Sequence, residues 1–153
     1  QNLPALIVDT NLSQQTETDL INEIKEADVL CLIYSLTDIM TYDRITQYWL
    51  PFIRSACSEL YKPIVIIGNK SDAIDGISED LDMLYITEQH PEVEGYFIVS
   101  ALDLLNLVET FQFSLKTFLQ PIRPLIDIKT KTISSSFEQA LHRIFSVHSI
   151  ICQ

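Results

Sequence analysis

The chain has 153 residues, of which 47% are hydrophobic, enough for one domain with a sizeable core. Its formal net charge of -11 argues against binding to a nucleic-acid backbone and against a basic membrane contact. The sequence predicts neither a signal peptide nor a membrane span, and its three widely spaced cysteines are expected to be reduced thiols.

Short apolar runs alternate with helical periodicity along the first 119 residues. The apolar runs are predicted to be buried strands, each followed by a helix. Such alternation is typical of a parallel α/β sheet with helices on both faces. In chain order, the strands are expected at 5–8, 29–36, 64–67 and 96–99, and the helices at 18–27, 41–60, 78–89 and 104–119.

The two longest predicted helices carry apolar residues at helical spacing, which indicates their inward faces. In the first, Tyr48 and its aromatic neighbours are expected to face the core. Pro51 should kink this helix, because its ring displaces the carbonyl four residues back. In the second, the spacing places Phe111, Phe113 and Phe118 in the core.

The organisation changes after residue 120. Two prolines interrupt the chain, and residues 121–134 are predicted to be a linker. A capping-box sequence and an apolar stripe then predict an amphipathic helix over 135–147. We therefore expect a first domain over 1–120 and the start of a second over 135–153.

The strongest indication of function follows the strand over 64–67. Asn69-Lys70-Ser71-Asp72 would lie at the carboxyl edge of the sheet, where α/β proteins bind ligands. Asp72 could accept two hydrogen bonds from the paired N–H donors of guanine, which adenine lacks. Asn69 could bind the base and tie neighbouring loops together, and Lys70 could lay its methylene stem along the ring. The alternative is a polar turn that closes the strand.

Three glycines, at positions 68, 76 and 95, are too few and too scattered for a glycine-rich phosphate loop. Phosphoryl transfer depends largely on the groups of such a loop and on Mg²⁺. We therefore expect no catalytic residues for phosphoryl transfer within this chain.

Several short motifs together resemble one protein family. Asn-Lys-x-Asp after a buried strand resembles the base-recognition box of small GTPases, and the strand ending in Asp9 resembles their magnesium box. The segment from Trp49 to Pro51 resembles the Trp-x-Pro helix of the Rho branch. Ser100-Ala101 after a strand resembles the last guanine-contacting box. Over residues 3–147 the chain resembles the mitochondrial Rho (Miro) GTPases, from the back part of their N-terminal GTPase domain to the first helix of their calcium-binding (EF-hand) region.

This resemblance implies a parallel-sheet, P-loop GTPase-like (Ras/Rho-type) α/β fold that is N-terminally truncated and carries an appended amphipathic helix. It also implies a magnesium-related role for Asp9, as an outer-sphere ligand. The family's usual lysine after Ser100-Ala101 is replaced by Leu102. The guanine-binding residues implied by the resemblance are Asn69, Lys70, Asp72, Ser100 and Ala101, with the backbone N–H of Ala101 directed at the guanine carbonyl oxygen.

The family resemblance further implies GTP or GDP with Mg²⁺ as ligands of the parent protein, and calcium in its downstream region. The implied role is GTP hydrolysis in mitochondrial transport and organisation, on the cytosolic face of the outer membrane, with motor-adaptor or mitochondrial proteins as partners. This chain alone is expected to be inactive and cytosolic. The alternative is a non-catalytic pseudo-GTPase module, or a truncated isoform, that binds transport adaptors.

Overall fold

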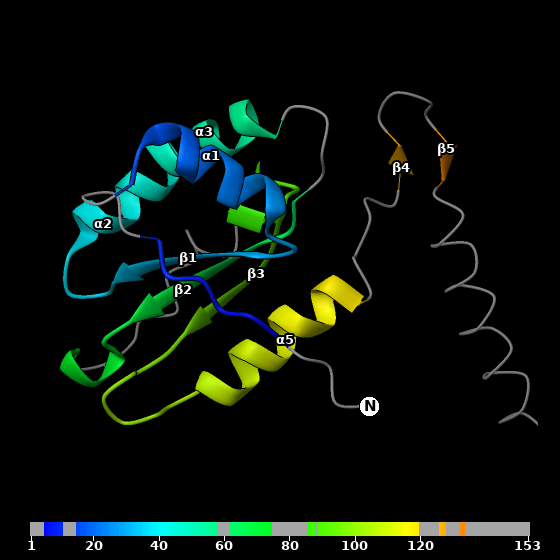
Figure 1. Ribbon diagram of the computed structural model, residues 1–153. Coiled ribbons are helices and arrows are strands. Elements are labelled where there is room, and N and C mark those ends of the chain that lie inside the picture. Colours follow the sequence, from blue (N-terminus) through cyan, green and yellow to red (C-terminus); the bar gives the residue numbers. More distant parts are fainter. Residues whose placement is uncertain are drawn as a thin grey trace, which may run out of the picture. The chain divides into compact units, whose positions relative to one another are not determined.

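Figure 1 shows the computed structural model of the chain, which divides into two compact units, residues 1–118 and 119–153. In the second unit, β4 (Ile126–Asp127) and β5 (Thr132–Ile133) form an antiparallel pair. The structure describes residues 5–10, 15–57, 62–74, 86–87, 89–119, 126–127 and 132–133. The predicted helix over 135–147 and most of that predicted over 78–89 lie outside these residues.

The first unit is built on a three-stranded parallel sheet in the order β1-β2-β3. β1 spans Leu30–Ser35, β2 spans Ile64–Asn69 and β3 spans Val93–Ile98, which confirms three of the four predicted strands. The four residues from Ile64 to Ile67 in the central strand are buried, as their uninterrupted apolar sequence predicts.

Helices cover both faces of this sheet (Figure 1). On one face lie α1 (Glu17–Glu26) and α3 (Leu50–Ala56), which pack against the side of β2 that carries Ile64 and Ile66. On the other face, Phe113 of α5 (Leu107–Leu119) packs with the cluster around Val65 and Ile67. The two-sided arrangement confirms the predicted α/β class.

The predicted strand over 5–8 is absent: residues 5–10 have no regular secondary structure. Leu6 is 89% exposed, because no described strand pairs with this segment and its apolar side chains find no sheet to cover. β1 is also less buried than predicted, since Ile33 is 65% exposed. Among the described strands, β1 pairs only with β2 and so forms an edge of the sheet. Its side chains on the α5 side of the sheet, such as Ile33, are therefore less covered than those of β2.

The predicted long helix is divided into α2 (Ile39–Arg44), a π-helical turn (Ile45–Trp49) and α3. The Leu50 N–H donates to the carbonyl of Ile45, five residues back, immediately before Pro51. The predicted distortion near Pro51 is thus a π turn. Its extra residue rotates Tyr48 outward, so the prediction that Tyr48 faces the core was wrong: it is 46% exposed and stacks on Phe52.

α5 begins at Leu107, three residues later than predicted, because Leu104 and Asn106 have positive φ angles of 58° and 57°. Its buried side is formed by small hydroxyl residues, each of which donates to the carbonyl four residues back. Phe113 lies in the core as predicted, but Phe111 and Phe118 were wrongly placed there. The buried hydroxyl residues are Thr110, Ser114 and Thr117.

Phe113 packs α5 against the sheet in the space that Gly95 leaves open. A Cβ added to Gly95 of β3 would lie 2.6 Å from the ring of Phe113. Four other bulky apolar residues lie on the outer flank of the helix, where they are 43–62% exposed. We call Val108, Phe111, Leu115 and Phe118 the α5 flank.

The start of α1 offers a test of local stability. The Thr16 hydroxyl accepts the Asp19 N–H at 3.2 Å, and the Asp19 carboxylate accepts the Thr16 N–H at 3.2 Å. Thr16→Ala should lower the free energy of unfolding by about 1 kcal/mol, whereas the exposed Thr18→Ala should change it little. Urea denaturation followed by circular dichroism measures both.

The same substitution should move one titration. Hydrogen bonds from Thr16 lower the pKa of the Asp19 carboxyl, so their contribution is present above the unfolded-state pKa and is lost as the pH falls through the lower folded-state value. Thr16→Ala should raise the pKa of Asp19 in an NMR pH titration. An unchanged pKa would contradict the capping geometry.

Candidate functional site

The candidate site lies where β1, β2 and β3 end. Asn69, the last residue of β2, pairs with Ser35, the last residue of β1, and the Leu36 N–H donates to the Asn69 carbonyl at 2.9 Å. Lys70 then adopts a left-handed conformation, with φ 72°, and turns the chain into a short 3₁₀ helix over Ser71–Ala73. The predicted motif is therefore a sharp turn at the carboxyl edge of the sheet.

The Asn69 side chain joins this turn to the loop that follows β3. Its Oδ1 accepts the backbone N–H of Lys70 at 2.8 Å and that of Ala101 at 3.0 Å. The predicted role of Asn69 in tying neighbouring loops is confirmed. The Ala101 N–H, which was predicted to meet guanine, is bonded to Asn69 instead in this structure.

A second tie connects Asp72 with Ser100. The Ser100 hydroxyl donates to Asp72 Oδ1 at 2.6 Å and accepts the Asp103 N–H at 3.0 Å. Ser100 is completely buried, whereas Asp72 is exposed. The buried hydroxyl holds one carboxylate oxygen in place, and the other carboxylate oxygen has no partner among the described residues.

The loop after β3 is closed on itself. The backbone groups of Ser100 and Leu105 bond to each other in both directions, at 3.2 and 3.0 Å. The Asn106 amide donates to the carbonyl of Ile98 at 2.9 Å. Leu102, which stands where the family has lysine, is 79% exposed at the tip of this closed loop. The loop is thus held by its own hydrogen bonds beside the Asn69–Asp72 turn.

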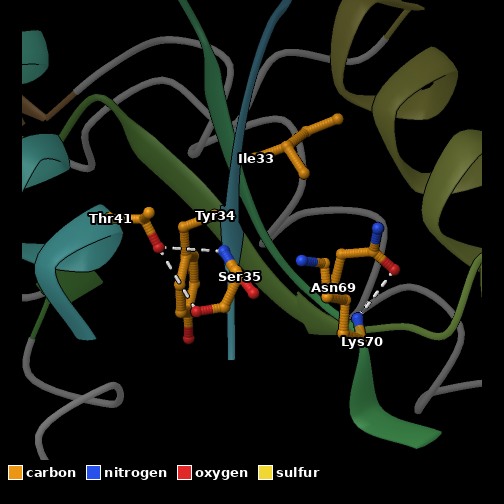
Figure 2. Close-up of a pocket in the computed structure, with 6 residues that line it drawn as sticks. All are labelled: Ile33, Tyr34, Ser35, Thr41, Asn69 and Lys70. Carbon is orange, nitrogen blue, oxygen red and sulfur yellow. Dashed lines mark hydrogen bonds between the residues drawn. The ribbon is translucent and has the colours of Figure 1, made fainter. Parts of the chain in front are cut away.

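A cavity of about 230 Å³ opens on the β1 side of the turn (Figure 2). Thr41 closes one wall: its hydroxyl accepts the Ser35 N–H at 3.0 Å and donates to the carbonyl of Asp38 at 2.5 Å. The cavity is lined by Ile33, Tyr34, Ser35, Thr41, Asn69 and Lys70.

The sequence analysis did not assign the four lining residues that precede Asn69. The available signal was the polar pair Thr37-Asp38 after the predicted strand over 29–36, since it marks a second strand end at the same edge. The pairing of Ser35 with Asn69 depends on strand register, which the sequence alone does not reveal.

Asp9 is exposed and lies in a segment without regular secondary structure. Its position therefore assigns it no role at the site. Within the part of the chain that the structure describes, no group of three or more His, Cys, Asp or Glu residues could hold a metal ion. The magnesium-related role of Asp9 therefore stays a prediction.

The described residues do fit a guanine base. The Asn69 amide nitrogen, the Lys70 ammonium and the second Asp72 oxygen have no partner among them. The hydroxyl of Ser71 is buried and also lacks a partner there. These groups offer the donors, the carboxylate acceptor and the apolar lysine stem that recognition of guanine requires.

A parallel sheet with Asn-Lys-Ser-Asp after one strand, tied to Ser-Ala after the next, is the arrangement of a small GTPase domain. The chain belongs to the Ras family, which matches residues 5–123. This result confirms the predicted Ras/Rho-type α/β fold.

The chain is also similar to mitochondrial Rho GTPases, as predicted. It is 35% identical to mitochondrial Rho GTPase 1 of Caenorhabditis briggsae over 158 residues, which cover 96% of this chain and 25% of the relative. It is 36% identical to that of Caenorhabditis elegans over 149 residues, covering 96% and 23%. It is 34% identical to that of Cryptococcus neoformans (strain JEC21) over 154 residues, covering 98% and 22%. The chain spans about a quarter of the length of these relatives.

In the described part of the chain, no helix is both long enough and apolar enough to cross a membrane.

Proposed function

We propose that this domain binds the guanine base of GTP and GDP, as part of a protein that acts like the mitochondrial Rho GTPases. The observation that carries the proposal is the pair of ties between the two loops, Asn69 to Ala101 and Asp72 to Ser100. They hold a carboxylate, an amide and a backbone turn together at the edge of the sheet where α/β proteins bind ligands. Membership in the Ras family implies the same class of ligand.

Each residue has a distinct task in this proposal. The open oxygen of Asp72 and the oxygen bonded to Ser100 accept the paired N–H donors of guanine, so Ser100 acts by positioning the carboxylate. Lys70 covers one face of the base with its methylene stem. The Ala101 N–H turns from Asn69 Oδ1 to the guanine carbonyl oxygen on binding, and Asn69 retains the bond from Lys70.

The proposed wider function belongs to the longer protein. We propose GTP hydrolysis with Mg²⁺, an outer-sphere role for Asp9, and a calcium-binding region that begins at 135–153 after a linker over 121–134. The place of action is the cytosolic face of the mitochondrial outer membrane, with motor-adaptor or mitochondrial proteins as partners. The names of the relatives support mitochondrial association, and this chain supplies base recognition rather than catalysis.

A non-catalytic interaction module is the second candidate. The observation that favours it is the exposed α5 flank, together with the exposed Ile33 on β1. Exposed apolar surface of this kind is typical of sites that bind other proteins. One measurement, the preference for guanine over adenine nucleotides, distinguishes the two candidates. An interaction module needs no such preference.

The direct test is titration of the ¹⁵N-labelled chain with GMP, followed by NMR. The amides of Lys70, Asp72 and Ala101 should shift, with the largest change at Ala101 because its N–H exchanges one acceptor for another. AMP should leave them unchanged at the same concentration. Equal shifts with both nucleotides, or no shift with either, would overturn guanine recognition.

The affinity should depend little on the number of phosphates. The chain has three glycines and a net charge of -11, so it offers no glycine-rich loop for a triphosphate and repels anions. We expect GTP and GMP to bind within about threefold of each other and no tighter than about 1 mM, or about -4 kcal/mol. Micromolar binding of GTP in excess Mg²⁺, measured with a fluorescent analogue, would contradict this expectation.

A further inference from the structure

Two tyrosines meet beneath the Asn69 turn, on the face of the sheet that α1 and α3 cover. Tyr34 of β1 pairs opposite Gly68, and Tyr96 of β3 pairs opposite Ile66, so the Tyr96 ring reaches along the strand toward Gly68. Their hydroxyl oxygens lie 2.6 Å apart, and the ring centroids are 6.4 Å apart with an interplanar angle of 29°. Tyr34 is 4% exposed and also lines the cavity beside Asn69.

The hydroxyl pair occupies space that only glycine leaves open. A Cβ added at Gly68 would lie 2.9 Å from the Tyr96 hydroxyl, 3.0 Å from the Tyr34 hydroxyl and 2.9 Å from Leu36 Cδ2. These separations are too short for a methyl group without movement of its neighbours. Gly68 therefore lets the two hydroxyl groups meet directly against the backbone of the central strand.

This contact lies at Gly68, one residue before the Asn69–Asp72 turn. The Gly68 carbonyl accepts the Val99 N–H at 2.8 Å, and the next residue, Asn69, makes the ties to Lys70 and Ala101. The hydroxyl pair thus joins the two outer strands across the central one at the level where the turn begins. Ser71 and Val99 continue the connection through a backbone bond of 3.2 Å.

We propose that Tyr34 and Tyr96 are positioning residues for guanine recognition: their hydroxyl pair, seated on Gly68, sets the separation of the strand ends and thereby the place of Asn69 and Ala101. The inference rests on the proposed function for its ligand, but its structural part concerns this chain alone. In this proposal the tyrosines act through Asn69 and Ala101 rather than by contact with the base.

The first test needs no ligand. Tyr34→Phe and Tyr96→Phe keep the rings and remove one hydroxyl each. Amide hydrogen exchange at Lys70 and Ala101 should become about fivefold faster in either variant, the factor expected for one lost hydrogen bond. Exchange at Val65 and Ile66, in the buried centre of β2, should change less than twofold. Tyr48→Phe is the matched control, because Tyr48 is exposed and remote from the pair in sequence.

A uniform change would show a different role. If exchange at Val65 and Ile66 accelerates as much as at Ala101, the tyrosines stabilise the whole sheet and the positioning role is wrong. No acceleration at Lys70 and Ala101 would also overturn it.

The second test uses compensation. Gly68→Ala should accelerate exchange at Ala101, because the new methyl group displaces the hydroxyl pair. Combined with Tyr34→Phe and Tyr96→Phe, the same methyl group has lost two of its three close neighbours and still meets Leu36 Cδ2, so it should add clearly less acceleration than it does in the unmodified chain. An additive effect of Gly68→Ala in the double phenylalanine variant would show that the glycine serves another purpose.

GMP titration separates this inference from the proposed function. The unmodified chain and Tyr48→Phe should bind GMP equally well, and either phenylalanine variant should bind it about fivefold more weakly. That result would support both the proposed function and the positioning role. Unchanged GMP affinity in both phenylalanine variants would overturn the positioning role alone. If the unmodified chain shows no guanine preference, the proposed function fails and with it the positioning role for guanine.

Discussion

Asp72→Asn should change the preferred base from guanine to xanthine. The asparagine can still accept the Ser100 hydroxyl through its amide oxygen, so the loop geometry that fixes residue 72 is preserved. Its amide nitrogen, however, donates where the carboxylate accepted, and it therefore opposes the amino group of guanine while matching the carbonyl oxygen that xanthine carries there. The loss toward guanine should be about 2–4 kcal/mol, or roughly 30- to 700-fold in affinity.

Saturation-transfer NMR with GMP and XMP measures this change at millimolar ligand. The unmodified chain should give a signal with GMP alone, and the variant should give one with XMP alone. Asp103→Asn is the matched control, since Asp103 is an exposed aspartate in the adjoining loop that contributes only its backbone N–H to Ser100. Retained preference for GMP in Asp72→Asn would remove Asp72 from the base site.

Ile66→Ala should have the largest effect on stability. Ile66 is fully buried at the centre of the sheet, within the core that α1 and α3 complete. Removing its outer carbons leaves a cavity that the surrounding helices cannot fill, which should lower the free energy of unfolding by about 2–5 kcal/mol. A domain of this size has about 5–15 kcal/mol in total, so the variant should unfold at much lower urea concentration.

The matched control is Ile33→Ala on the neighbouring strand. Ile33 is 65% exposed, so its truncation removes little buried surface and should cost less than about 1 kcal/mol. Urea denaturation followed by circular dichroism compares the two variants in the same units. Similar losses at both positions would mean that the open side of β1 is covered in solution.

The sequence predicted the central strand and the turn after it, because both are local features. A strand buried on both faces appears as an unbroken apolar run, and Asn69-Lys70-Ser71-Asp72 follows it directly. The tie between Asn69 and the loop after β3 was also predictable, since parallel strands end at one edge.

Periodicity could not decide which side of α5 faces the sheet. It identified an apolar stripe that includes Phe111 and Phe118, but the buried side carries Thr110 and Ser114, whose hydroxyl groups are satisfied within the helix. Residues that bond to their own backbone are compatible with burial, and a hydrophobicity pattern counts them as polar.

Contacts between distant segments could not be predicted from the sequence, for another reason. The hydroxyl pair of Tyr34 and Tyr96 joins residues 62 positions apart, and it depends on the register of both strand pairs with β2. The segment over 5–8 shows the converse: it has a strand-like sequence but no described partner strand, and it therefore forms no strand.

The α5 flank has a practical consequence for how folding of this protein is followed. Four apolar side chains that are 43–62% exposed give the native state a surface that binds environment-sensitive dyes such as ANS. Strong dye fluorescence at low temperature would then report the intact helix rather than a partly molten form. A dye-based melting curve should start from a high baseline and fall or flatten, so the transition is better read from near-ultraviolet circular dichroism of the packed aromatic residues.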